Sequence, residues 1–195
     1  MKKAVLFVIF SVILMTFFAG GADAYSVHYT QTITTPESQT PITMKIWEKD
    51  EKMRIESVAG GMGFTTIYRK DGIYNIVPGQ NMATKMPVPE TTTNALKNHE
   101  KYLDEIKSLG AKQVGTENID GVPCDIYEYN EPAAGSQIKV WVRQKERFPA
   151  KMTATVLNKT TEIRFTDIQI NKDVPDELFT IPKGMKIIDI SQQMQ

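Results

Sequence analysis

The sequence contains very few of the side chains on which metal sites and nucleophilic enzymes are built. Cys124 is its only cysteine, and His28 and His99 are its only histidines. A single cysteine excludes an intrachain disulfide, and these three residues show no recognisable zinc-ligand spacing. As a nucleophile Cys124 would need a base and an orienting partner, and no residue is indicated for either role. We interpret it as a buried, unreactive thiol, with a bridge between two chains as the alternative.

Other signatures of catalysis and of nucleic-acid binding are also missing. No two Asp or Glu residues are placed as an acid and base pair. The glycine-rich segment 60–63 lacks the lysine and the strand-to-helix context of a phosphate loop. The 23 basic and 23 acidic residues balance and form no basic run, which argues against nucleic acid and anionic lipid headgroups as partners. We therefore expect a protein that is not an enzyme and needs no cofactor.

The longest hydrophobic run is too short to cross a bilayer. Ala4–Phe18 spans about 15 residues, whereas roughly 20 are needed. Lys2 and Lys3 precede it, and Ala22-x-Ala24 follows as a signal-peptidase site. A retained membrane anchor is the alternative interpretation. A lipoprotein signal would need a cysteine near Tyr25, and the sequence has none there.

These observations predict a signal peptide at residues 1–24, cleaved after Ala24, and a mature protein in the periplasm. No linker, internal repeat or low-complexity tract divides the rest of the chain. Residues 25–195 are therefore expected to form one domain, long enough to build its own core.

The mature sequence is dominated by alternation of apolar and polar residues. It is clearest in Ile138–Arg143, Lys151–Val156 and Thr161–Phe165. A period of two buries one face of a strand and leaves the other in solvent, as in antiparallel sheets. Shorter alternating segments occur at 27–34, 42–47, 53–56, 64–68, 73–77, 80–86, 113–119 and 124–129.

Turn signals separate these segments. Asp71-Gly72 and Asp120-Gly121 are typical of tight hairpins. In the last long strand Ile163 and Phe165 fall out of phase with Ile168 and Ile170, which predicts a bulge near Thr166-Asp167.

One segment, Asn94 to Leu109, has the period of a helix. Leu96, His99, Leu103 and Ile106 recur every three or four residues, and Gly110 is a stop signal. The fold class predicted is mainly β (α+β). It is a single curved antiparallel sheet of about ten strands, forming an incomplete barrel covered by one inserted amphipathic helix.

The order of the pieces resembles a known family. The segments that carry the likeness are Arg54, Tyr68–Pro78, Ala83–Lys85, Gly121–Tyr127, Lys139–Val142, Phe148–Lys151 and Val174–Pro182. Over nearly the whole mature chain this succession is similar to the periplasmic lipoprotein-carrier superfamily, which includes LolA, LolB, the sensor RseB and outer-membrane lipoprotein-sorting-like proteins.

The resemblance implies a half-barrel whose apolar cavity takes up acyl chains beneath a helical lid. Arg54 best matches the arginine that helps hold that lid shut, although a solvated arginine beside Glu56 would give the same pattern. The lid would consist of Arg54, Leu96, Leu103 and Ile106. The floor of the cavity would consist of Ile42, Met44, Ile46, Ile138, Val140 and Val142.

Methionines and tryptophans add two ambiguous signals. Met44, Met53, Met82, Met86 and Met152 would suit either a deformable cavity or a gap-filled core. Trp47 and Trp141 lie opposite aliphatic residues on their strands, so they either line a ligand surface or pack in a core.

Two functions follow. The first is a periplasmic binding protein that shelters a lipid or the acyl chains of a lipidated protein. The second is an RseB-like protein-interaction or sensor domain of the cell envelope, without lipid cargo.

Overall fold

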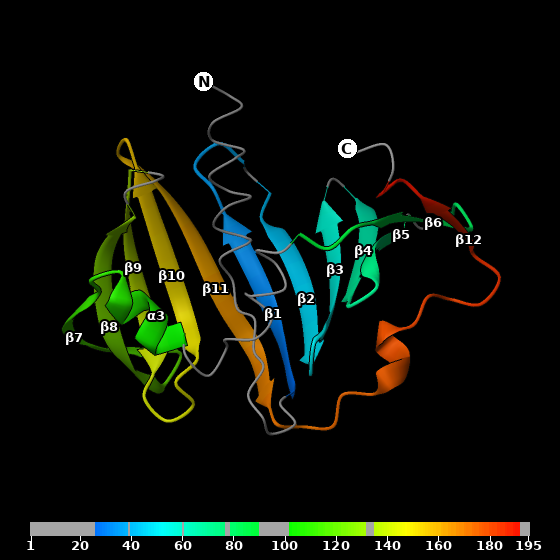
Figure 1. The fold of residues 1–195 in the computed structure, drawn as a ribbon. Helices are drawn as coiled ribbons and strands as arrows, with labels where there is room; N and C mark the ends of the chain where they lie inside the picture. The colour runs from blue at the N-terminus through cyan, green and yellow to red at the C-terminus, as the bar shows by residue number, and fades with distance from the viewer. Residues whose placement is uncertain are drawn as a thin grey trace. The chain divides into compact units, whose positions relative to one another are not determined.

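The computed structural model describes residues 26–38, 40–59, 61–76, 79–89, 102–131 and 135–191. Twelve strands dominate these residues (Figure 1). The first six are β1 (Ser26–Thr34), β2 (Ile42–Lys49), β3 (Lys52–Ala59), β4 (Met62–Arg69), β5 (Gly72–Ile76) and β6 (Met82–Met86). The others are β7 (Lys112–Ile119), β8 (Val122–Glu131), β9 (Ser136–Arg143), β10 (Pro149–Val156), β11 (Lys159–Ile170) and β12 (Lys186–Asp189).

The strands form one open, mixed sheet in the order β12-β6-β5-β4-β3-β2-β1-β11-β10-β9-β8-β7. Most neighbours in this order are joined by short hairpins, such as β2–β3, β4–β5 and β8–β9, and these pairs are antiparallel. The predicted mainly-β fold with a single open sheet is confirmed. The sheet has twelve strands rather than about ten, and the pair β12–β6 is parallel.

β12 was missed because its local sequence carries no strand signal. It has four residues, and only one of them is even half-buried. Its hydrogen-bond partner β6 lies about a hundred residues earlier in the chain, so the pairing is decided by tertiary structure. A parallel pair also needs a long connection, which no turn signal announces.

Turn chemistry accounts for the hairpins. Asp120 and Gly121 between β7 and β8 both have positive φ, 50° and 82°, as a type I′ turn requires. Leu157 and Asn158 between β10 and β11 do the same, with φ of 48° and 62°. In β11, Asp167 has a φ of 53°, at the place where the sequence predicted a bulge.

Among the described residues, two helical segments interrupt the strands: the α-helix α3 (Tyr102–Ser108) and the 3₁₀ helix η2 (Asp176–Phe179). α3 ends at the predicted glycine. The Gly110 amide donates to the Lys107 carbonyl at 2.9 Å and the Ala111 amide to the Ile106 carbonyl at 2.9 Å, while Gly110 has a φ of 87°. This is a Schellman C-cap. The earlier part of the predicted helix, Asn94 to residue 101, lies outside the described residues.

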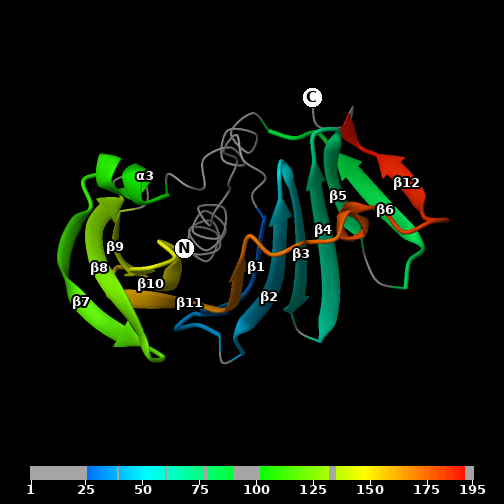
Figure 2. The ribbon, with the colours of Figure 1, turned by 90° about the horizontal axis from the view of Figure 1, so that it is seen from below.

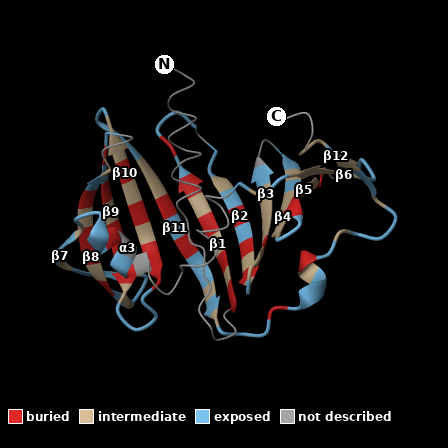
Figure 3. Cartoon of the chain, viewed as in Figure 1, coloured by how far each residue is buried: buried red, intermediate tan, exposed pale blue. Residues whose placement is uncertain are grey.

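Contacts divide the described chain into two compact units. The α3 unit contains residues within 32–41 and 100–165, and the η2 unit contains residues within 18–31, 42–99 and 166–195. In the α3 unit, α3 lies beside β8 and β9 (Figures 1 and 2). Buried and exposed residues alternate along many strands of both units (Figure 3).

Candidate functional site

Strand pairing in the η2 unit gathers methionines on one face of the sheet. Residues directly opposite each other in an antiparallel ladder point to the same face, as do residues two apart on one strand. The pairs Glu48–Met53, Met53–Tyr68, Tyr68–Ile73 and Ile73–Met86 therefore link β2 to β6 through one face. We call this the methionine face. Its apolar members are Ile42, Met44, Ile46, Met53, Ile55, Met62, Phe64, Ile73, Met82 and Met86.

The methionine face is buried at its centre and open at one end. Met44 is 6% exposed and Met53 is 2% exposed. Met62 and Phe64, near the β3–β4 turn, are 64% and 36% exposed. The sequence left open whether its methionines line a cavity or fill a core, and strand pairing shows that Met44, Met53, Met62, Met82 and Met86 share one surface.

Three polar residues of β1 and β2 lie among these apolar side chains. The Tyr29 hydroxyl donates to Glu48 Oε1 at 3.2 Å, which places β1 residues Tyr29 and Gln31 on the methionine face with Glu48. Glu48 is 3% exposed and Gln31 is fully buried. Burial raises the pKa of Glu48 well above its usual value, partly offset by the Tyr29 hydrogen bond.

Gln31 has no hydrogen-bond partner for either amide atom among the described residues. The sequence analysis did not identify Glu48 or Gln31 as buried polar residues. A signal did exist for Glu48, because it continues the apolar phase set by Ile42, Met44 and Ile46 on β2. An acidic residue in an apolar phase indicates a buried carboxyl, which calls for a partner or a shifted pKa.

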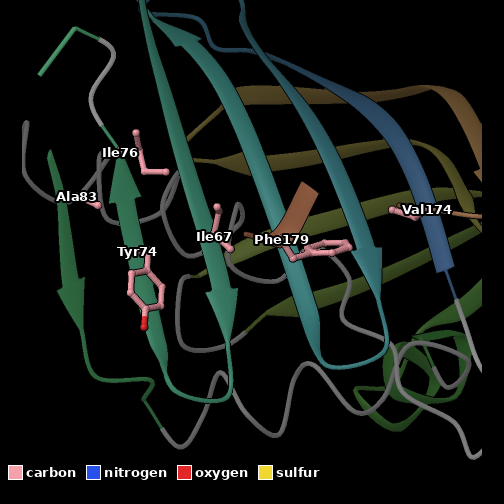
Figure 4. Close-up of a cluster of buried hydrophobic side chains, with 6 residues drawn as sticks. All are labelled: Ile67, Tyr74, Ile76, Ala83, Val174 and Phe179. Carbon is pink, nitrogen blue, oxygen red and sulfur yellow. The ribbon is translucent and has the colours of Figure 1, made fainter. Parts of the chain in front are cut away.

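The opposite face of the same strands is covered by the segment that contains η2. Figure 4 shows this cluster, in which residues from β4, β5 and β6 lie with residues of the segment. Its buried members are Ile67, Tyr74, Ile76, Ala83, Val174 and Phe179, with Trp47, Leu178, Ile181 and Met185 packed around them. We call this the clamped face.

Polar contacts hold the η2 segment in place. Arg54 donates from Nη1 to the Leu178 carbonyl at 2.9 Å and from Nη2 to Glu56 Oε1 at 2.7 Å. Lys49 and Lys52 reach the Asp176 carboxylate at 3.2 and 2.8 Å. Arg54 is therefore both beside Glu56 and bound to the C-terminal segment. Its predicted role as a latch for the helical lid stays a prediction.

In the α3 unit a second apolar face contains the other predicted floor residues. Ile138, Val140 and Val142 alternate along β9, are each at most 2% exposed, and lie opposite Tyr129, Tyr127 and Asp125 of β8. Met152 of β10 pairs with Val140 and shares this face. The two predicted floor triplets thus occupy one face each, in separate units.

The predicted lid residues are partly described. Leu103 and Ile106 of α3 are 7% and 2% exposed, so the apolar stripe of the helix is buried as its period indicated. Leu96 lies outside the described residues.

The reverse face of the α3 unit packs Trp141 and Cys124 in a small cluster with Ile126 and Ala150. Trp141 donates its indole proton to Glu117 Oε2 at 2.6 Å, and the Lys151 ammonium lies 4.6 Å from the centre of its ring. Trp141 therefore belongs to packing rather than to an open ligand surface.

Cys124 is a free thiol that is fully buried, and burial raises its pKa. Trp47, on the clamped face, stacks on His28 with ring centres 4.9 Å apart. These observations support the interpretation of Cys124 as a buried thiol and of Trp47 as a packed side chain.

A cleft of about 370 Å³ lies between the β2–β3 and β4–β5 turns. The side chains that line it are charged: Asp50, Glu51, Lys52, Arg69, Lys70 and Asp71. Arg69 donates to both carboxylate oxygens of Asp71 at 2.8 and 2.6 Å and holds the pKa of Asp71 at about 2. Lys70 pairs with Glu51, so the charges of this cleft largely neutralise one another.

Comparisons with known proteins place the chain by family and by fold. Residues 19–191 match the model of a family described as predicted periplasmic protein (DUF2092). A search of curated proteins found no match. In the described residues no helix is long and apolar enough to cross a membrane.

Several solved structures share the fold at low identity. An uncharacterized conserved protein from Thermus thermophilus is 9% identical, with a TM-score of 0.60 over 86% of this chain and 91% of that chain. MucB, solved in the Pseudomonas aeruginosa MucA/MucB complex, is 10% identical, with a TM-score of 0.53 over 84% of this chain and 58% of that chain. The lipoprotein LppX from Mycobacterium tuberculosis is 13% identical, with a TM-score of 0.51 over 89% and 98%.

These matches confirm the resemblance in fold that was stated from the sequence. The periplasmic expectation agrees with the description of the family. Cleavage after Ala24, and the boundary between residues 24 and 25, stay predictions.

Proposed function

The chain belongs to the DUF2092 family of predicted periplasmic proteins, and on that premise we propose that it binds an apolar ligand against the methionine face. The ligand class is a lipid or the acyl chains of a lipidated protein. The observation that carries the proposal is the gathering of Met44, Met53, Met62, Met82 and Met86 on one face of five strands.

Methionine side chains are unbranched and polarizable, so they adapt to acyl chains that differ in length and shape. Burying each methylene of such a chain gains about 0.8 kcal/mol, so a chain of about ten methylenes gains about 8 kcal/mol before the cost of association is subtracted. Met62 and Phe64, exposed at one end of the face, would be the rim that a ligand touches first.

The proposal can be tested by native mass spectrometry on protein exported to the periplasm and purified without detergent. We expect an adduct of lipid mass on the native chain. Polar substitution of the rim, Met62→Gln with Phe64→Gln, should reduce its occupancy about tenfold, because two apolar contacts are lost.

Val58→Gln is the matched control. Val58 is 58% exposed near the same hairpin, and its pairing with Gly63 places it on the clamped face. It should leave the adduct unchanged. A native chain without any adduct, in the presence of periplasmic lipid, would contradict the proposed function.

We also propose that α3 covers an apolar face of its own unit, the face of Ile138, Val140 and Val142, through Leu103 and Ile106. Replacing both with polar residues should reduce lipid retention more than it reduces the free energy of unfolding. Equal loss of both properties would show that α3 is a fixed part of the core.

A second candidate function is binding of an envelope protein. One matched structure is a complex, that of MucB with MucA, and this chain exposes Val58, Met62 and Phe64 at one hairpin. A copurifying polypeptide, together with a ligand-free mass, would favour this candidate over the first.

A further inference from the structure

The methionine face contains one polar side chain whose hydrogen-bonding groups are unused. Gln31 is fully buried, and neither Oε1 nor Nε2 has a partner among the described residues. A buried amide without partners costs free energy, and native proteins keep few of them. It therefore calls for an explanation beyond packing.

The surroundings of Gln31 are mostly apolar. Val27 and Tyr29, on the same side of β1, are 0% and 1% exposed. Tyr29 donates a hydrogen bond to Glu48, and burial raises the pKa of that carboxyl. No Lys or Arg of β2 to β6 lies on the methionine face, because Lys45, Lys49, Lys52, Arg54, Arg69 and Lys85 all fall in the opposite phase.

This environment determines which class of ligand head group can bind beside Gln31. An ionised carboxylate or a phosphate would lose its hydration there without gaining a cation. A primary amide offers one acceptor and two donors. Its complement is an uncharged head that also carries both an acceptor and a donor, such as a carboxamide.

We propose that Gln31 is a specificity-determining residue that selects acyl ligands with an uncharged, amide-like head over ionised fatty acids and over heads that only accept hydrogen bonds. The inference rests on the proposed function, since it names the ligand class of the same face. The Gln31 Nε2–H would donate to the carbonyl of the head, and Oε1 would accept from its N–H.

The test compares three probes that share one chain length: dodecanamide, methyl dodecanoate and the dodecanoate ion at pH 8. Their affinities for the exported protein are measured by displacement of N-phenyl-1-naphthylamine, a neutral fluorescent probe. On the native chain dodecanamide should bind about tenfold more tightly than the methyl ester, because only the amide satisfies both atoms of Gln31. The dodecanoate ion should bind most weakly.

The Gln31→Leu variant should bind dodecanamide and the methyl ester about equally. Without ligand it should also unfold at a higher temperature, by about 2–4 °C, because a buried amide without partners has been removed. A glutamine satisfied in the folded core would give the opposite shift. Gln137→Leu, at an exposed position of β9, is the control and should keep the native selectivity.

The outcomes separate the two claims. Equal affinity of the native chain for dodecanamide and the methyl ester would overturn the role of Gln31 and leave the binding function standing. Absence of binding by any of the probes would overturn both. The comparison on the native chain decides the question even if the variant does not fold.

Discussion

Strands β2–β6 present two faces that are both apolar but are filled in different ways. On the clamped face the chain covers itself: Phe179 is 2% exposed, and Arg54, Lys49 and Lys52 tie the η2 segment down through hydrogen bonds and ion pairs. On the methionine face, half of the ten apolar side chains are flexible methionines, and Glu48 and Gln31 are buried among them. The first arrangement is that of a core. The second combines adaptable apolar groups with isolated polar groups, as ligand sites do.

The largest effect is expected from removing the side chain at the centre of the clamped face. Phe179→Ala deletes a ring that packs on Ile67 and Tyr74 in the cluster of Figure 4. It should lower the free energy of unfolding by about 3–5 kcal/mol, the usual cost of such a cavity. Urea denaturation measures it.

The Phe179→Ala molecules that remain folded should bind an apolar ligand with the same affinity as the native chain. A matching loss of binding in the folded fraction would show that the two faces are not independent.

A smaller effect is expected from removing Arg54, which binds the η2 segment. Arg54→Ala removes the hydrogen bond to the Leu178 carbonyl and the pair with Glu56, and it should cost about 1–2 kcal/mol. Arg54→Lys keeps the charge but lacks the fork that reaches both partners, so it should recover only part of the loss. Thermal unfolding of the two variants side by side gives the comparison. Full recovery of stability in Arg54→Lys would show that Arg54 acts through its charge alone and not through its two hydrogen bonds.

On the methionine face we expect a substitution that stabilises. The folded pKa of Glu48 is raised above 4.5, so the folded state binds the proton more tightly than the unfolded chain does. The stability that the protonated Glu48 carboxyl contributes is fully present below pH 4.5, and it is lost as pH rises toward the folded pKa. In Glu48→Gln the side chain keeps nearly the same size and shape but has no group that titrates.

Glu48→Gln should therefore gain stability over the native chain as pH rises above 4.5, and show little difference below it. Unfolding curves at several pH values from about 4 to about 8 measure this trend. A constant difference across that range would contradict a neutral, buried Glu48.

The smallest effect is expected at Asp176, where Lys52 and then Lys49 lower the pKa of an exposed carboxylate. Stability from a lowered pKa is present above the unfolded pKa and is lost as pH falls through the folded one. Asp176→Asn should shift Tm only slightly, and the shift should vanish in high salt because exposed pairs are screened. A large, salt-independent shift would show that this ion pair, rather than Phe179, fixes the η2 segment.

Local sequence is enough to specify the strands, most of their turns and the end of the helix. Alternation of apolar and polar residues, Asp-Gly pairs and the stop at Gly110 are local signals, and strand and turn geometry respond to local sequence. The resemblance to the lipoprotein-carrier fold was also readable from the sequence, because it depends on the order of these pieces.

Which side chains meet is settled by tertiary structure alone. Met44, Met53, Met62, Met82 and Met86 become one surface through the pairing of β2 to β6, and β12 joins β6 across about a hundred residues. The partner of Arg54 at Leu178 and the isolation of Gln31 likewise depend on strand register and on chain segments distant in sequence. Period-two patterns fix which residues share a face of one strand, whereas the neighbours of that face are set by long-range pairing that no local pattern encodes.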